Sequence, residues 1–388
     1  MVKLSITCHG NVTNAEKITK FLSKKRFTFG LVASYSETCE IPGITIAGAD
    51  KEFLKFTAPA DSEYIEYGKC VCIPGIPISP DGKPTPALLT RISLNTAKIP
   101  HFVVNAGSMV RPSLCYFDAD IIPGKNISES PAMSIEQVKS AINYGKKLGK
   151  IKSQNTDCLV VGECVPGGTT TALAVLRASG LECNVSSSMQ NNPLDLKNKI
   201  VSDALKRKES DDILDIVANF GDPMMPVCAG MLSTASENCN VILAGGTQML
   251  AVLKLAKTIG YNIENSAIGC TSYIVDDSQA RFLDTVREID DIAVLSCDPC
   301  LHNSQHFGLR SYADGFVKEG AGAGGAAAAC SSSSASDSSE PSSSGPACGS
   351  GPPLRRYITN GTDSAAKPTK IKTGIIKGTP LTKSLSVR

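Results

Sequence analysis

The sequence contains no tryptophan, only four histidines, and a net charge of only +2 at pH 7. It has no apolar run near the ~20 residues that cross a membrane, and polar residues follow its first six, so neither a membrane span nor a secretory signal is expected. Lysine and arginine are dispersed, whereas nucleic-acid binding proteins usually concentrate them in a basic field. We therefore expect a cytoplasmic protein whose partners are neither nucleic acids nor membranes.

The composition is that of a globular protein with a tail. The 388 residues are 42% hydrophobic and 20% charged, enough for one large core or for a large and a small one. From about Cys330 the sequence becomes rich in serine and then in glycine and proline, and residues 367–388 are basic. Such a composition cannot bury enough apolar surface to fold. We predict a folded domain over residues 1–329 and a disordered tail over 330–388; a targeting or docking role for the basic end is the alternative.

Fifteen cysteines are present, but an odd number in a long chain does not indicate a disulfide scaffold. Most are expected to be buried thiols. Two close pairs, Cys70 with Cys72 and Cys297 with Cys300, together with the histidines at 302 and 306, have the chemistry of zinc ligands. The other interpretation is that the first pair alternates across a strand and the second lines the turn after a strand at 292–295.

Short apolar runs alternate with segments of helical spacing along the chain. The expected strands are residues 29–34, 99–105, 158–162, 183–186, 241–244, 266–270 and 292–296, and the expected helices are residues 134–148, 170–179, 198–207, 226–235 and 249–259. Strands that alternate with helices predict a doubly wound, mostly parallel sheet in a three-layer α/β fold. Ligands of such folds bind beyond the carboxyl ends of the strands.

One glycine-rich turn follows the expected strand at 158–162. Glu163 lies directly after Gly162, and the sequence then reads Gly167, Gly168 and three threonines, including Thr169 and Thr170. The N–H groups and the positive dipole end of the following helix, with the threonine hydroxyls, would hold a phosphate or a ribose. A purely structural turn is the alternative.

A second turn places Glu319 before an unbroken run of glycine and alanine that ends at Ala329. With Gly320 and Gly322 supplying a floor of backbone, poor solvation would raise the pKa of this carboxyl towards that of a general base. The alternative is that Glu319 caps the helix begun by residues 326–329. A third turn, Gly245, Gly246 and Thr247, follows the expected strand at 241–244.

The residues of these turns carry a family resemblance. Residues 162–172, 198–205 and 319–323 resemble, in order and approximate spacing, the nicotinate-nucleotide:dimethylbenzimidazole phosphoribosyltransferase family. The segments 36–49 and 56–64 look like those of its divergent branch. The resemblance covers roughly residues 25–329 and adds a smaller lobe, built from the N-terminal segment and the helix after Glu319, to the expected fold.

The resemblance implies an enzyme that transfers the phosphoribosyl group of nicotinate mononucleotide to a benzimidazole-type base. Glu319 matches the general base of the family, Glu163 and residues 167–170 match the donor-binding turn, and Lys199 matches a lysine near the donor phosphate. Because the donor carries no diphosphate, neither a metal nor another cofactor is implied. Members of the family pair, so a homodimer is expected.

The sequence departs from the better-known branch at two phosphate turns, which here read Ala244 to Thr247 and Ser296 to Pro299. Gly245, Gly246 and Thr247 still offer N–H and hydroxyl donors, and Asp222 is a substitute for a ribose contact. Residues 84–91, with Leu88, Leu89 and Arg91, lie where the family contacts the base, although Pro86 is also a typical first residue of a helix.

Other functions remain open at this point. One is a phosphoribosyltransferase or nucleosidase of the same fold that acts on another base, and another is a nucleotide-binding protein without activity. His302 and His306 are candidates for lining the site because they precede Glu319 on one loop.

Overall fold

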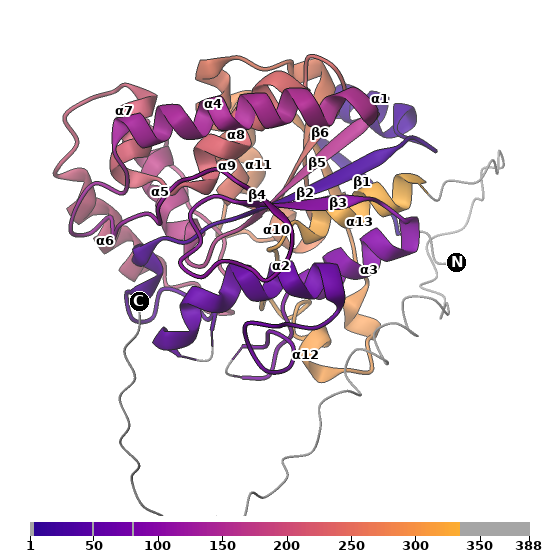
Figure 1. Cartoon of the computed structure of the whole chain (residues 1–388), viewed down its shortest axis with the longest axis horizontal. Coiled ribbons are helices and arrows are strands. Elements are labelled where there is room, and N and C mark those ends of the chain that lie inside the picture. The colour runs from indigo at the N-terminus through magenta and orange to yellow at the C-terminus, as the bar shows by residue number, and fades with distance from the viewer. Residues whose placement is uncertain (1–3, 49, 80, 334–388) are drawn as a thin grey trace, which may run out of the picture.

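A computed structural model describes residues 4–48, 50–79 and 81–333. In this part of the chain eight strands form one sheet in the order β1-β8-β7-β6-β5-β2-β3-β4. β1 pairs antiparallel with β8, and every other neighbouring pair is parallel. Helices lie above and below the fan of strands (Figure 1). The prediction of a three-layer, mostly parallel α/β fold is confirmed.

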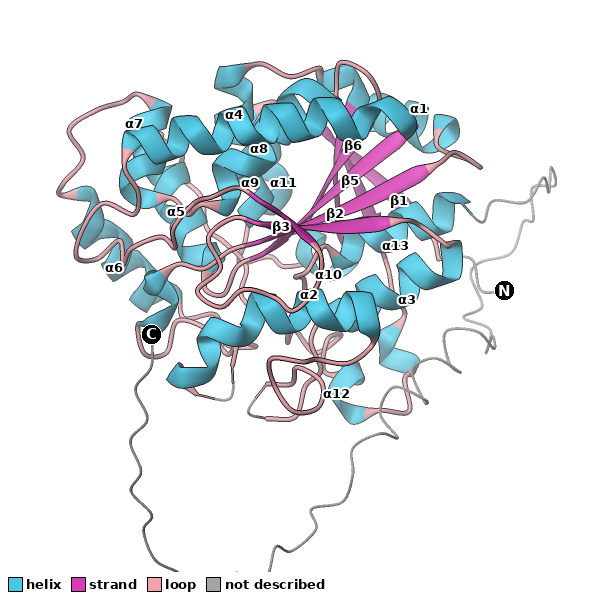
Figure 2. Cartoon of the chain, viewed as in Figure 1, coloured by secondary structure: helices cyan, strands magenta, loops and turns pink. Residues whose placement is uncertain are grey.

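The elements alternate along the chain as expected (Figure 2). The strands are β1 Ile6–Gly10, β2 Phe27–Ala33, β3 His101–Asn105, β4 Tyr116–Asp118, β5 Cys158–Cys164, β6 Asn240–Ala244, β7 Ser266–Thr271 and β8 Ala293–Cys297. The α-helices are α1 Val12–Phe21, α2 Thr57–Tyr67, α3 Ala87–Ala97, α4 Ile135–Lys152, α5 Gly168–Ala178, α6 Leu194–Leu205, α7 Ile213–Phe220, α8 Met224–Ala235, α9 Gln248–Ile259, α10 Ser272–Val275, α11 Phe282–Ile289, α12 Phe307–Arg310 and α13 Ala323–Ser333. The five helices expected from periodicity are confirmed.

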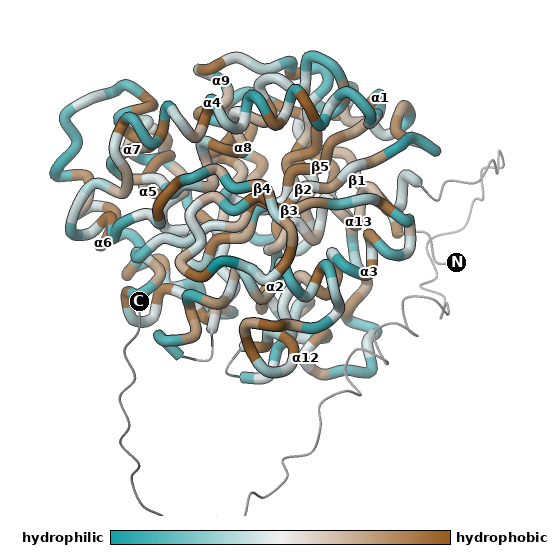
Figure 3. The backbone as a smooth tube through the Cα atoms, viewed as in Figure 1, coloured by the Kyte–Doolittle hydropathy of each residue, from teal (hydrophilic) through white to brown (hydrophobic). Residues whose placement is uncertain are grey.

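Each face of the sheet has its own hydrophobic core. Along β5, Leu159 and Val161 belong to the core shared with α4, α5, α7, α8, α9 and α11. Cys158 and Val160 belong to the core shared with α1, α2, α3 and α13. Successive side chains of a strand point to opposite faces, so a central strand covered on both sides is apolar throughout. Figure 3 shows hydrophobic stretches gathered on the central strands.

Two glycines let α13 lie directly on the sheet. A Cβ atom at Gly324 would be 2.0 Å from the Cys270 carbonyl carbon in β7, and one at Gly325 would be 2.3 Å from Cβ of Ala244 in β6. Side chains at these positions would push the helix away from the strands. The close approach fixes the turn before α13, which carries Glu319, at the carboxyl ends of β6 and β7.

The N-terminal residues and the last helix lie in the main layers. Residues 6–33 contribute β1, α1 and β2, and α13 packs against β6, β7, β8 and α3. α2, α3 and α12 lie together below the sheet (Figure 1). The last helix continues to Ser333, with Ser331 and Ser332 buried, so it passes the predicted boundary at 329 by four residues. The rest of the predicted tail lies outside the described residues.

The prediction of a strand at residues 183–186 is wrong, because this segment is an irregular, largely buried loop. Side chains, rather than a neighbouring strand, bind its carbonyl groups: Arg177 donates to Cys183 O, and Asn192 donates to Val185 O at 2.7 Å. Residues 70–72 are likewise not a strand, whereas β1 and β4 were not predicted. Among the described residues, no helix has the length and apolar character of a membrane span.

Candidate active site

A cavity of about 260 Å³ lies at the carboxyl ends of the central strands, close to the lower end of the roughly 300–1,000 Å³ typical of small-molecule sites. One wall consists of residues from 44–61 and 73–86, and the other of the end of β5, the start of α5 and the turn around Glu319. Much of the first wall is apolar, including Ile44, Ile46, Phe53, Phe56, Ile73, Ile76 and Ile78.

Glu319 lines this cavity and is held by backbone N–H groups. Its Oε2 accepts a hydrogen bond from Thr271 N at 2.7 Å, and its Oε1 accepts from Gly320 N and Gly324 N, both at 3.1 Å. Burial raises the pKa of the carboxyl to about 7, although these N–H groups favour the charged form. Glu319 therefore lines the cavity, as its interpretation as a general base requires. It also caps the start of α13, as the alternative interpretation requires.

Glu163 is another carboxyl that lines the cavity, and it is buried. Gln248 Nε2 donates to its Oε2 at 2.9 Å, whereas its Oε1 has no hydrogen-bond partner. Burial raises the pKa of Glu163 to about 8, helped by the charges of Glu319 and Asp222. Two carboxyls that oppose each other's ionisation titrate as a pair, so this pair is not fully ionised at neutral pH.

Several predicted site residues lie behind these carboxyls and do not line the cavity. A Cβ atom at Gly245 would be 3.1 Å from Glu163 Cγ, and one at Gly246 would be 3.6 Å from Glu319 Cβ, so these glycines leave room for the carboxylates. Asp222 is fully buried and accepts a 2.6 Å hydrogen bond from Thr171 Oγ1. Gly322 packs against the Phe29 ring, whereas its neighbour Gly320 does line the cavity.

The glycine turn after β5 lines the cavity as predicted. Gly167, Gly168 and Thr169 are in its wall, and Gly167 precedes α5 with a φ of +70°, a conformation that favours glycine. Thr170 does not line the cavity; its hydroxyl is buried without a hydrogen-bond partner. The positive dipole end of α5 therefore faces the cavity, and of its first N–H groups those of Gly168 and Thr170 bond to Val165 O and Gly167 O, which leaves that of Thr169 for a ligand.

The lysine beside this turn is Lys197 rather than Lys199. Lys197 is fully buried, and its Nζ donates to Thr169 Oγ1, Ser186 O and Asn192 Oδ1, each at 3.1 Å. Burial lowers its pKa to about 7, with help from the charge of Lys318. Lys199, two residues along α6, is exposed and does not line the cavity. Neither lysine lines the cavity, but because helical positions two apart face different directions, Lys197 bonds to Thr169 of the cavity wall and Lys199 points away.

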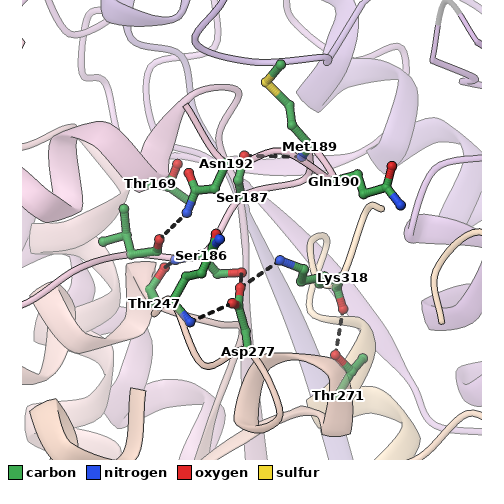
Figure 4. A network of polar contacts seen from close by, with 12 residues as sticks. Thr169, Ser186, Ser187, Met189, Gln190, Asn192, Thr247, Thr271, Asp277 and Lys318 are labelled. Atoms are coloured by element: carbon green, nitrogen blue, oxygen red, sulfur yellow. Dashed lines mark hydrogen bonds and ion pairs between the residues drawn. The ribbon is translucent and has the colours of Figure 1, made fainter. Parts of the chain in front are cut away.

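Figure 4 shows a polar network that links Ser186, Asp277 and Lys318, and Lys197 joins it by donating to Ser186 O. Lys318 Nζ forms a 2.6 Å ion pair with Asp277 Oδ2, which also accepts from Ser186 Oγ at 2.7 Å. Thr247 Oγ1 accepts from Ser186 N at 3.3 Å, which places the third predicted turn against the network rather than in the cavity wall. The network thus connects the loop at 183–188 to the turn around Glu319 and to the turn at 245–247.

The expected base-binding segment is divided between the cavity and the core. Pro84, Thr85 and Pro86 line the cavity, and Pro86 also precedes α3, which agrees with both interpretations of that proline. Leu88 and Leu89 belong to the core instead. Arg91 donates to the carbonyl groups of residues 64–66 at the end of α2 and is therefore structural.

Several cavity residues were not singled out from the sequence. They are Asp61, Lys83, Cys164, Ser187, Ser188 and Gln248. Asp61 lies inside the segment 56–64 that carried part of the resemblance, and Gln248 directly follows the third turn. Position next to these motifs was the only signal available for them.

The cysteine pairs and histidines remain outside the cavity wall. Cys70 donates to Ala60 O, Cys297 ends β8, and neither His302 nor His306 lines the cavity. Within residues 4–48, 50–79 and 81–333, no group of three or more histidine, cysteine, aspartate or glutamate side chains is arranged to hold a metal ion.

The chain resembles known phosphoribosyltransferases in fold and, over part of its length, in sequence. The fold is that of a nicotinate-nucleotide-dimethylbenzimidazole phosphoribosyltransferase from Thermus thermophilus, with a TM-score of 0.56 at 17% identity over 80% of this chain and 83% of that one. The family model described as "Phosphoribosyltransferase" matches residues 95–274. The shared fold and the family-model match over residues 95–274 confirm the resemblance.

The chain belongs to the UPF0284 family. It is 46% identical over 303 residues to the UPF0284 protein of Archaeoglobus fulgidus, a match that covers 78% of this chain and 87% of that protein. It is 41% identical over 307 residues to the UPF0284 protein of Saccharolobus solfataricus, with the same coverage of both chains.

Proposed function

We propose that the protein transfers the phosphoribosyl group of nicotinate mononucleotide to a nitrogen of a benzimidazole-type base, with Glu319 as the general base. The bond between ribose C1′ and the pyridinium nitrogen breaks, and its electron pair leaves with nicotinate, whose ring becomes neutral. A bond forms between C1′ and the azole nitrogen, and the proton of that nitrogen passes to Glu319. No metal is needed because the donor has no diphosphate to neutralise.

The observation that carries this proposal is the state of Glu319. The carboxyl lines the cavity and is partly exposed there, and desolvation raises its pKa to about 7. A general base works best when its pKa lies near the working pH, since it must be ionised yet still attract the proton. Three backbone N–H groups fix its position without supplying a competing charge.

The donor fits the opposite side of the carboxyl pair. The start of α5 offers its positive dipole end and the Thr169 N–H to the phosphate, and Lys197 lies one hydrogen bond away through the Thr169 hydroxyl. An anion bound there would favour the charged form of Lys197, whose pKa burial has lowered. Protonated Glu163, with its unpartnered Oε1, suits a ribose hydroxyl. A homodimer, which size-exclusion chromatography would detect, belongs to the same proposal.

The test is nicotinate release from nicotinate mononucleotide with and without dimethylbenzimidazole, for the wild type and Glu319→Gln. We expect acceptor-dependent release that falls by ~100-fold or more in the variant. Glu52→Gln, at an exposed carboxylate, is the matched control and should behave as wild type. Because both Glu319 oxygens accept N–H groups, the glutamine amide loses at least one of these bonds, so the unfolding midpoint of each variant is measured as well.

The outcomes separate the alternatives. Release by the folded wild type without any acceptor would show a nucleosidase, in which water replaces the base. Binding of nicotinate mononucleotide without release, whatever azole is added, would refute the transfer reaction and leave a nucleotide-binding protein. Unchanged release by a folded Glu319→Gln would refute the role of Glu319 alone.

A further inference from the structure

Asp61 is a buried carboxyl of the cavity wall that the reaction proposed above does not use. It lies on α2, is 5% exposed and lines the cavity. Its Oδ1 accepts a 2.7 Å hydrogen bond from Thr85 Oγ1, and its Oδ2 accepts from Cys164 Sγ at 3.4 Å. Keeping a carboxylate ionised in an apolar wall costs free energy unless a hydrogen-bond donor or a positive charge pairs with it.

A second carboxyl on the same helix has a structural role and serves as a comparison for Asp61. Glu63, two residues on, accepts from Val71 N, Cys72 N and Ser113 N at 2.6 to 2.9 Å. Burial raises its pKa, but these N–H groups outweigh it and the net pKa is lowered. Asp61 has only a hydroxyl and a thiol, and burial raises its pKa to about 6. Since a carboxylate offers about four acceptor sites, Asp61 has room for another donor.

One hydroxyl lies near in the chain: Thr57, four residues before Asp61 on α2, also lines the cavity, and its Oγ1 is buried without a hydrogen-bond partner. The nearby wall is apolar, with Phe56, Ile73 and Ile76 among its residues. The one lysine in this wall, Lys83, pairs with Asp81 and lies over the Phe316 ring, 3.8 Å from its centre. Thr85 and Cys164 are the two groups that bond to the Asp61 carboxylate, so a further donor can come from what the cavity binds.

Asp61 contacts both halves of the cavity: Cys164 links it to the end of β5, next to Glu163, and Thr85 links it to the segment beside the Glu319 turn. Its partner Thr85 precedes Pro86, whose Cγ is 3.0 Å from the place of a Cβ atom on Gly320. Thr90 of α3 donates to Ala321 O at 2.7 Å, which ties this wall to the Glu319 turn. A flat base whose nitrogen faces Glu319 would turn its far edge towards the wall that carries Asp61.

We propose that Asp61 selects the acceptor, accepting a hydrogen bond from an amino group on the six-membered ring of a bicyclic azole. The proposal rests on the transfer reaction above and narrows its acceptor class to amino-substituted bases. A methyl group at this place would leave the carboxylate buried without a donor. Sites built to bind an N–H group discriminate strongly against analogues that lack it.

The test compares two acceptors of nearly equal shape, 5-aminobenzimidazole and 5-methylbenzimidazole, by kcat/KM for nicotinate release. We expect the wild type to prefer the amino compound by ~10-fold or more. Asp61→Leu should remove or reverse this preference, because an apolar side chain of similar size favours the methyl group. Glu52→Gln should keep the wild-type ratio.

The outcomes distinguish this inference from the reaction it rests on. Release with neither acceptor means that the transfer reaction has failed, whatever Asp61 does. Release with both at equal rates in the wild type, or a preference that Asp61→Leu leaves intact, overturns the role of Asp61 and leaves the reaction standing. If Asp61→Leu does not fold, the wild-type ratio alone decides.

Discussion

Replacing Lys197 with methionine tests the electrostatics of the site without any substrate. The amine is fully buried, and its three hydrogen-bond partners are neutral oxygens. Burial and the charge of Lys318 lower its pKa from 10.5 to about 7. Below pH 7 both folded and unfolded chains hold the proton, so the folded chain bears the full penalty of a buried charge. As the pH rises from 7 to 10.5, the folded chain loses the proton first and stability increases.

The magnitude follows from this pKa difference. One pKa unit corresponds to about 1.4 kcal/mol, so between pH 6.5 and 9.5 the amine should add about 3 kcal/mol to the wild type's free energy of unfolding. Lys197→Met lacks this gain, because its thioether does not titrate. Relative to the wild type, the variant is therefore least stable at high pH and most stable near pH 6.5.

Urea unfolding of both proteins at the two pH values measures this difference, and other titrating groups cancel in the comparison. Lys199→Met, two residues along the same helix but exposed, is the matched control and should track the wild type. If the difference in the free energy of unfolding between wild type and Lys197→Met stayed constant with pH, the inference that Lys197 is buried without a charged partner and has a lowered pKa would be refuted.

Three further predictions concern the carboxyls and the packing around them. Because Glu319 must be ionised to accept a proton and burial raises its pKa to about 7, kcat/KM for acceptor-dependent release should rise between pH 6 and 8; a profile flat over this range would contradict its role. Gly324→Ala should lower the free energy of unfolding by ~3 kcal/mol, since its Cβ would meet the Cys270 backbone at 2.0 Å; an unchanged urea midpoint would show that α13 can shift. Thr171→Val removes the donor to buried Asp222 and should destabilise the fold by about 1–3 kcal/mol, with Thr45→Val, at a partly exposed hydroxyl, as the comparison in thermal melts.

Sequence periodicity was enough for the layers of the fold because its signals are local. The apolar run at 158–162 and the helical spacing at 134–148 each reflect burial of that segment alone. Residues 183–186 also include an apolar and a β-branched side chain, Cys183 and Val185, but the side chains of Arg177 and Asn192, six and seven residues away, bind the carbonyl groups of these two residues. No local pattern distinguishes such a loop from a strand.

The residues of the candidate site were predictable where a glycine-rich turn of the backbone forms it, and less predictable where contacts between distant parts of the chain form it. Glu163, Glu319 and the turn at 167–169 were found because glycine marks close approach of the backbone. Lys197 was missed in favour of Lys199, since spacing along the chain does not say which of the two lysines points inward. Asp61 lies in the middle of a helix with no turn beside it, and only the fold brings it to the cavity.

The bonds that Glu319 makes to the end of β7 and to the start of α13 have an evolutionary consequence. A relative without the proposed reaction would still need an acceptor for those backbone N–H groups, so selection for folding alone would retain this glutamate. Its presence in a relative is therefore poor proof of activity. Asp61, which has no comparable set of backbone bonds, is free to drift once its ligand changes, and its replacement would record a change of substrate more faithfully.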